Sequence, residues 1–189
     1  MLLWTIQEES VYNSILTDGF YRCDISKSPL GQDLKEGYDW LIEQMKSRIG
    51  DPPDGVVYPV WAWYQWEGKR KKPDLRRERW SCGNKGDRFA CMEIDIPDEE
   101  VLLSDFDAWS IILLHGLISS SEEEDRVLEE RYEALSTKEQ RLFKSNNWER
   151  IFDLTPLENE WTIRADSIQA TFWELRKEQI MDVRFFTAA

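Results

Sequence analysis

A basic segment, residues 69–80 (KRKKPDLRRERW), is the part of the sequence whose residue types point most directly to binding chemistry. It contains seven basic and two acidic residues, a local net charge of +5, whereas the rest of the chain sums to −18. Arginine binds phosphate and carboxylate groups with two parallel hydrogen bonds, and lysine attracts them as a point charge. We therefore expect this segment to bind an anionic or nucleotide-like small molecule. The alternative is a solvated loop that pairs with the acidic surface of the same protein.

A tryptophan-rich segment, residues 56–66 (VVYPVWAWYQW), precedes the basic one. If it is a strand, its period of two places Trp61 and Trp63 on one face, and Ala62, Tyr64 and Trp66 on the other. Indole rings next to cationic side chains suit a planar anionic ligand. Core packing of a strand covered on both faces is the alternative. The predicted ligand-binding residues are Trp4, Trp63, Arg70, Lys72, Arg76 and Arg77.

Metal and cofactor motifs are missing from the sequence. The single histidine, His115, has no second histidine within four residues, and Cys23, Cys82 and Cys91 have no C-x-x-C spacing. We therefore predict no metal site. Neither a P-loop nor G-x-G-x-x-G occurs, which argues against a Walker-type NTPase or a Rossmann dehydrogenase, and no cofactor is evident. Asp105 and Asp107 are expected to cap a helix.

Composition limits the classes of partner. Of the 189 residues, 41% are hydrophobic and 13% are aromatic, which is typical of a folded domain rather than a disordered chain. The net charge of −13 makes bulk nucleic acid and anionic membranes unfavourable partners. With three cysteines and neither a signal peptide nor an apolar run long enough to span a membrane, the sequence predicts a cytoplasmic protein.

The hydrophobic pattern predicts one α+β domain over residues 1–189, with a mixed or antiparallel sheet, flanking helices and a long basic loop at about 67–87. Strands are expected at 2–6, 20–23, 56–66, 88–96, 101–103, 160–164, 167–175 and 183–186. The strand at 88–96 alternates most clearly, and Pro59 predicts an edge position or a bulge for 56–66.

Helices are expected where apolar residues recur every three or four positions, and the stripe at 34–49 is the clearest. Further helices are expected after Glu8, after Ser104, after Ser121 and after Thr137. Capping boxes are predicted for the pairs Thr5/Glu8, Asp33/Glu36, Ser121/Glu124 and Thr137/Gln140. Gly19 and Gly50 are expected to end the first two helices.

Several strings resemble a bacterial family known as domain of unknown function 3841. They are LWTIQ at the start, YPVWAWYQW followed by KKPDLR, VLLSDFDAWS, WERIFDL, and IQATFWEL near the end. The resemblance covers nearly the whole chain. It implies a soluble bacterial domain and carries no activity.

A second resemblance concerns DarT-like ADP-ribosyltransferases. WTIQEESVYNSILTDG is similar to the first strand, helix and glycine of that fold, and IQATFWELRKEQIMDV is similar to its late catalytic strand. The match places Trp4 and Thr5 at a Tyr-His pair that holds NAD. Gln169 and Thr171 stand near the catalytic glutamate position, and Glu174 is the nearest acid. The resemblance implies Thr5, Gln169 and Glu174 as candidate catalytic residues, with NAD as cofactor.

Three hypotheses follow from the sequence. The first is a domain that binds an anionic ligand through residues 69–80. The second is an ADP-ribosyltransferase-like enzyme that uses NAD, in a toxin or phage-defence context, with Arg70 or Arg76 at the pyrophosphate. The third is a protein–protein interaction module whose aromatic surface is covered by a protein partner or by a second copy in a homodimer.

Overall fold

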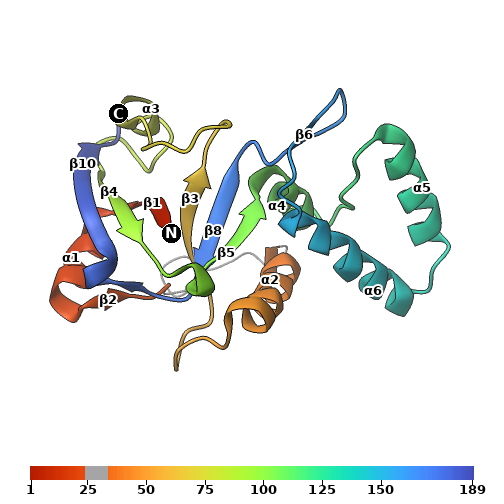
Figure 1. Ribbon diagram of the computed structural model, residues 1–189, viewed down its shortest axis with the longest axis horizontal. Coiled ribbons are helices and arrows are strands. Elements are labelled where there is room, and N and C mark those ends of the chain that lie inside the picture. The colour runs from red at the N-terminus through yellow and green to blue at the C-terminus, as the bar shows by residue number, and fades with distance from the viewer. Residues whose placement is uncertain (24–33) are drawn as a thin grey trace.

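A six-stranded sheet forms the centre of the protein, as the computed structural model shows for the residues it describes, 1–23 and 34–189. Its order is β10-β4-β1-β3-β8-β5, and each pair of neighbours is antiparallel (Figure 1). The strands are β1 (Leu2–Glu8), β3 (Val60–Gln65), β4 (Arg88–Asp95), β5 (Leu102–Asp105), β8 (Ile168–Phe172) and β10 (Ile180–Thr187). The predicted α+β fold with an antiparallel sheet is confirmed.

Helices and short strand pairs surround this sheet. The helices are α1 (Glu9–Asp18), α2 (Lys35–Ile49), α3 (Leu75–Glu78), α4 (Phe106–Leu113), α5 (Glu122–Glu133) and α6 (Thr137–Trp148), with 3-10 turns η2 (Asp98–Glu100), η3 (Glu149–Phe152) and η4 (Lys177–Gln179). β2 (Phe20–Tyr21) pairs with β9 (Leu175–Arg176), and β6 (Leu157–Glu158) pairs with β7 (Ile163–Arg164). α5 and α6 extend away from the sheet beyond β5 (Figure 1). No described helix is both long and apolar enough for a membrane span.

Two hydrophobic clusters hold the layers together. One packs α1 on the sheet through Leu3, Ile15, Ala90, Met92 and Ile94, all of which are fully buried. The predicted alternation of β4 is therefore confirmed. The other packs α2 with α4 and α6 through residues that include Leu41, Met45, Trp109, Ile112 and Trp148. The predicted stripe of α2 supplies the first two.

The first predicted capping box is wrong. β1 continues to Glu8 because its backbone pairs with β4 as far as the Glu8–Phe89 partners, so Thr5 lies inside a strand. α1 begins at Glu9 without a side-chain cap and ends, as predicted, at Gly19, whose φ is 86°. The predicted Asp33/Glu36 box lies partly outside the described residues.

Pro59 has a different role from the predicted one. β3 begins directly after it and lies inside the sheet, between β1 and β8, so the missing proline N–H precedes the ladder. A bulge does occur, but further along, where the register against β8 shifts between Trp63 and Gln65. The extra residue brings Trp66 to the side of Trp63, with 4.5 Å between their ring centres. The prediction that Trp66 lies on the opposite face is wrong for this reason.

Two caps in the second half differ from the predicted ones. α6 begins at Thr137, but Ser136 and Glu139 form its capping box, and the Gln140 amide donates to the Tyr132 carbonyl oxygen instead. Ser121 caps α5 as predicted, whereas the Glu124 carboxylate accepts a hydrogen bond from the Ser120 N–H.

The last strands are shorter than predicted. Asn159 accepts hydrogen bonds from the N–H groups of Trp161 and Thr162, and this turn limits the strand at 160–164 to Ile163–Arg164. The strand at 167–175 covers only Ile168–Phe172, because the chain then leaves β5 and pairs with β2.

Candidate functional site

The site begins where β1 and β3 separate. The two strands are in register at Trp4 and Trp63. Further along β1, the Thr5 hydroxyl donates to the Trp61 carbonyl oxygen at 2.8 Å, and the Gln7 amide donates to the Thr5 hydroxyl at 3.0 Å. Side chains thus replace ladder hydrogen bonds at this point, and a hollow lies between the strands.

We call this hollow the aromatic cleft. Tyr38 and Trp109 lie with ring centres 5.2 Å apart, Trp61 and Trp109 with 5.3 Å, and Trp63 and Phe106 with 5.0 Å. Edge-to-face and tilted contacts of this kind leave ring faces available for a planar guest. The lining residues are Thr5, Ile6, Gln7, Tyr38, Trp61, Ala62, Trp63, Phe106, Trp109 and Gln169.

Gln169 is the most unusual residue of the aromatic cleft. It lies on β8 directly opposite Trp63, so the two side chains share a face of the sheet. The residue is only 4% exposed, and its Nε2 has no hydrogen-bond partner among the residues described. The hydroxyl of Ser104, its neighbour on β5, is also buried without a partner within that part of the chain. Such groups are rare in proteins, because a buried donor without an acceptor loses its hydrogen bonds to water.

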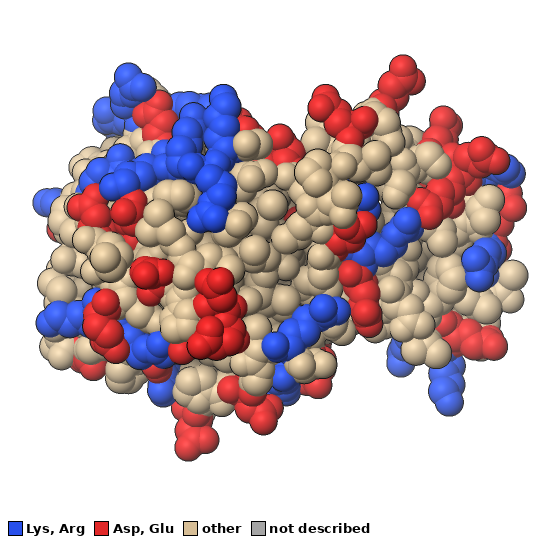
Figure 2. All heavy atoms as spheres, in the orientation of Figure 1, with Lys and Arg blue, Asp and Glu red and all other residues tan. Residues whose placement is uncertain are grey.

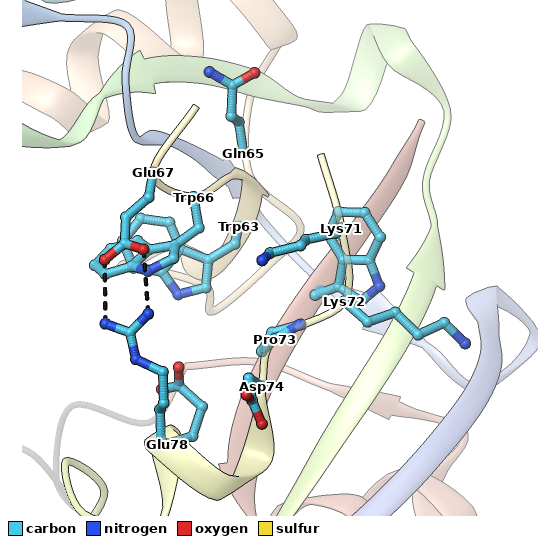
Figure 3. A pocket seen from close by; sticks show the side chains of 11 residues that line it. Trp63, Gln65, Trp66, Glu67, Lys71, Lys72, Pro73, Asp74 and Glu78 are labelled. Atoms are coloured by element: carbon cyan, nitrogen blue, oxygen red, sulfur yellow. Dashed lines mark hydrogen bonds and ion pairs between the residues drawn. The ribbon is translucent and has the colours of Figure 1, made fainter. Parts of the chain in front are cut away.

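A second hollow, the loop pocket, shares Trp63 with the aromatic cleft. Its cavity volume is about 70 Å³. Trp63 and Trp66 form one wall of it, and Lys71, Lys72 and Pro73 of the segment after β3 lie across from them (Figure 3). The lining residues are Trp4, Trp63, Gln65, Trp66, Glu67, Lys71, Lys72, Pro73, Asp74, Arg77 and Glu78. The bulge in β3 makes this pocket, since it moves Trp66 beside Trp63.

Backbone contacts fix the start of the loop. Trp66 and Lys69 exchange two hydrogen bonds of 3.0 Å, and the N–H of Gly68 donates to the Asp166 carbonyl oxygen at 2.8 Å. Glu67 is held at a φ of 47°, a left-handed conformation that costs a glutamate free energy. The tight turn explains why the loop folds back over the tryptophans.

Three of the seven basic side chains of residues 69–80, those of Lys72, Arg76 and Arg77, have acidic partners among the described residues. Arg77 bonds to both carboxylate oxygens of Glu67, at 3.2 and 3.3 Å, and lowers the pKa of Glu67. Arg76 pairs with Asp74 and lowers the pKa of that carboxyl to about 2. The charges of Arg76 and Arg77 are therefore compensated by neighbouring carboxylates.

Lys72 and Arg70 also have partners within the protein. Lys72 lies 3.0 Å from Glu93 and 3.1 Å from Asp182, and hydrogen bonds to these carboxylates raise the pKa of Lys72. Arg70 donates to the Leu2 carbonyl oxygen at 2.8 Å and stacks 3.7 Å above the Tyr64 ring. Arg70 anchors the loop to the sheet rather than lining either hollow.

Among the three cations that line the loop pocket, only Lys71 has no acidic partner in the described part of the chain. Its ammonium points into the loop pocket, toward the Trp63 side of the wall (Figure 3). No carboxylate among the described residues forms an ion pair with it, in contrast to Lys72 and Arg77. Basic side chains gather on this part of the surface, over the α3 region (Figure 2). Lys71 is the one among the pocket-lining cations that can take a new anion without giving up an existing partner.

The structure divides the predicted site residues into groups. Trp4, Trp63, Lys72 and Arg77 line the loop pocket, whereas Thr5 and Gln169 line the aromatic cleft together with Trp63. Arg70 and Arg76 line neither hollow.

Glu174 lies elsewhere. It pairs with Arg22 at 2.6 Å and lines a separate depression with Trp173 and Arg176. Thr171 is fully buried, and its hydroxyl donates to the Leu102 carbonyl oxygen at 3.3 Å. The late-strand residues therefore do not gather at one point, and only Gln169 reaches the aromatic cleft.

Sequence reasoning missed several residues of the two hollows. Lys71 and Lys72 are adjacent residues of the same type, and their residue type does not distinguish the free ammonium from the paired one. Tyr38, Phe106 and Trp109 are visible as apolar positions of helices, but only the packing of α2 and α4 brings them to β3.

The other predicted titratable residues have structural roles. Asp105 caps α4, accepting hydrogen bonds from the N–H groups of Ala108 at 2.8 Å and Ala165 at 2.5 Å. His115 lies 3.1 Å from Glu36. Across residues 1–23 and 34–189, no group of three or more histidine, cysteine or acidic side chains is arranged to hold a metal ion.

Comparison with known proteins gives a family and no activity. The family model described as "Domain of unknown function (DUF3841)" matches residues 2–181 of the 189. No curated protein matches the chain.

Proposed function

The chain belongs to the family described as "Domain of unknown function (DUF3841)", and from its own residues we propose that it binds a nucleotide-like ligand. Such a ligand combines a planar ring with an anionic group. The observation that carries the proposal is the position of Trp63, which lines both hollows. A ligand in contact with this ring borders both the uncharged aromatic cleft and the pocket that Lys71 lines.

The aromatic cleft suits the ring of the ligand. Its lining combines five aromatic side chains with the polar groups of Thr5, Gln7 and Gln169. Ligand sites typically consist of apolar and aromatic walls with a few polar groups that fix the orientation. No acidic or basic side chain is among the cleft's lining residues, so a neutral ring is favoured.

The loop pocket suits the anionic group. Lys71 supplies an ammonium without a partner in the described chain, and Arg77 on the rim can exchange Glu67 for a ligand oxygen. A hydrogen bond between an ammonium and a phosphate is stronger than one between neutral groups. The whole protein carries a net charge of −13, so this basic part of the surface is a local attraction for anions.

Calorimetric titration with adenosine monophosphate tests the proposal. We expect measurable binding, weakened about tenfold by Lys71→Met, since one charge-assisted contact contributes about 1.4 kcal/mol or more. Lys69→Met is the matched control, because it removes the same charge from the same exposed loop at a position that lines neither hollow. The proposal is contradicted by an absence of binding at millimolar concentration, or by equal effects of the two variants.

A transferase that uses NAD is supported less well. Thr5 and Gln169 do lie in one cleft, as the resemblance to ADP-ribosyltransferases implies. The candidate acid Glu174 is held by Arg22 in a different depression, however, and the cleft lining contains no carboxylate. Such chemistry needs a negative charge beside the developing oxocarbenium ion. Incubation with NAD and analysis for released nicotinamide separates this activity from simple binding.

A protein-interaction role is favoured by one observation on α5 and α6. α5 has no buried residue, and Val127 and Leu142 are 40% and 63% exposed. Light scattering over a wide concentration range tests whether α5 and α6 associate with a second copy of the protein. A constant monomer mass argues against a homodimer.

A further inference from the structure

The orphaned amide of Gln169 points to what the ligand ring must carry. Resting on the proposed function, we infer that Gln169 selects rings with a hydrogen-bonding edge, as nucleobases have, over plain aromatic rings. Gln169 is thus a specificity-determining residue of the aromatic cleft, whereas Lys71 binds the anionic group whatever the ring.

In the free protein, the Gln169 amide nitrogen is unpaired within the described part of the chain. Nε2 of Gln169 is buried and has no acceptor among the residues that the structure describes. A leucine or methionine at this position would fill similar space without an unpaired polar group. A glutamine that contributes no internal hydrogen bond through its Nε2 gains one when a ligand brings an acceptor into the cleft.

The strand pairing places the Gln169 amide where it can turn toward a ring that contacts Trp63. β8 lies between β3 and β5, and its partners fix the Gln169 backbone opposite Trp63 and Ser104. The last torsion of a glutamine side chain is broad and nearly two-fold, so the amide can turn its N–H toward a guest without moving the strand. A ring that contacts Trp63 therefore lies within the range of this amide.

A complementary group lies across the cleft. Gln7 uses its Nε2 for the Thr5 hydroxyl, and its Oε1 is the acceptor that remains for a guest. Gln169 and Gln7 together offer one donor and one acceptor among aromatic walls. Each nucleobase carries both a donor and an acceptor on its edge, whereas a phenyl ring carries neither. A site with uncharged donors and acceptors rejects rings that leave them unpaired.

Three phosphates separate ring recognition from anion binding: adenosine monophosphate, ribose 5-phosphate and phenyl phosphate. In the wild-type protein we expect the nucleotide to bind at least about tenfold more tightly than the other two. Gln169→Leu should remove most of this advantage and leave the affinity for phenyl phosphate unchanged. Its melting temperature should stay the same or rise, because an unpaired buried amide is removed.

Gln179→Leu is the matched control. Gln179 is also buried, at 5% exposure, and its Nε2 also lacks a partner among the described residues. It lies outside the aromatic cleft, and its Oε1 accepts a hydrogen bond from the Arg176 N–H at 2.8 Å. This variant should melt at a lower temperature and keep the preference for the nucleotide.

The outcomes distinguish the two proposals. If none of the three phosphates binds, the proposed function fails and this inference fails with it. If all three bind equally, or if Gln169→Leu weakens all of them to the same extent, the inference is overturned while anion binding stands. A lower melting temperature for Gln169→Leu, with the nucleotide preference retained, would make Gln169 a structural residue and overturn the inference as well.

Discussion

The loop pocket and the aromatic cleft share Trp63 but are built in opposite ways. The loop pocket is formed by an irregular segment with charged, exposed side chains, of which Lys72, Asp74 and Arg77 are already paired. The aromatic cleft is formed by strands and helices, and its polar groups are uncharged and largely buried. Of the seven basic side chains of residues 69–80, four have hydrogen-bond or ion-pair partners within the protein, whereas the buried Nε2 of Gln169 has none among the described residues.

The two regions also differ in what a ligand must displace. Solvent screens exposed ion pairs such as Glu67–Arg77, which therefore contribute little free energy, so an anion can exchange with Glu67 easily. A buried donor without an acceptor is costly, and satisfying it adds both affinity and selectivity. The loop pocket is therefore suited to attracting an anion, and the aromatic cleft is suited to selecting among rings. Variants that change only one of these two properties test this difference.

The largest effect is expected at the shared ring. Trp63→Ala should lower the free energy of unfolding by about 3 kcal/mol, since a large aromatic side chain and its contacts with Trp66 and Phe106 are lost. For a protein of this size that corresponds to a fall in melting temperature of roughly 10 °C. Denaturant unfolding measures the first quantity and calorimetry the second. Binding of adenosine monophosphate should be lost as well.

Trp80→Ala is the control for this variant, because Trp80 is 76% exposed. It should change the free energy of unfolding by no more than about 0.5 kcal/mol and leave nucleotide binding intact. If Trp63→Ala changed the free energy of unfolding and nucleotide binding as little as Trp80→Ala does, Trp63 would not be a shared binding residue of the two hollows.

The next largest effect is expected for a variant that disturbs the aromatic cleft but not the loop pocket. Asp105→Ala removes the cap of α4, which carries Phe106 and Trp109, and leaves the N–H groups of Ala108 and Ala165 without their acceptor. We expect a loss of about 2 kcal/mol in the free energy of unfolding. Affinity for adenosine monophosphate should fall while affinity for inorganic phosphate is retained. Equal losses for both ligands would show that the two regions are not separable.

Some of this organisation follows from the sequence and some does not. The alternation in β4 and the stripe of α2 are local patterns, so they predict those elements correctly. The bulge at Trp63 and Gln65 depends on register against β8, and it decides on which face Trp66 lies. Similarly, the partner of Lys72 on β10 and the lack of one for Lys71 in the described chain are set by tertiary packing. The candidate residues were visible, but their division into two hollows was not.

The smallest effect is expected at the rim of the loop pocket. Glu67→Gln frees Arg77 from its partner, so inorganic phosphate should bind about threefold more tightly at neutral pH. Because Arg77 lowers the pKa of Glu67, the wild-type carboxylate stays ionised down to acid pH. Below that pKa the wild-type residue also becomes neutral, and the difference between the two proteins should vanish.

Calorimetric titration at a series of pH values checks this prediction. Glu130→Gln is the control, since Glu130 pairs with Arg126 in a similarly exposed position on α5, away from both hollows. A gain in phosphate affinity of the same size in that variant would indicate a general effect of net charge rather than a role of Arg77.

A crystal structure of the complex with adenosine monophosphate shows whether one ligand occupies both the aromatic cleft and the loop pocket. We predict the adenine ring against Trp63 in the aromatic cleft, hydrogen-bonded to the Gln169 amide, with the phosphate within hydrogen-bond distance of Lys71 Nζ. A nucleotide bound away from Trp63, or a phosphate held by Arg76 with the aromatic cleft empty, would contradict the account.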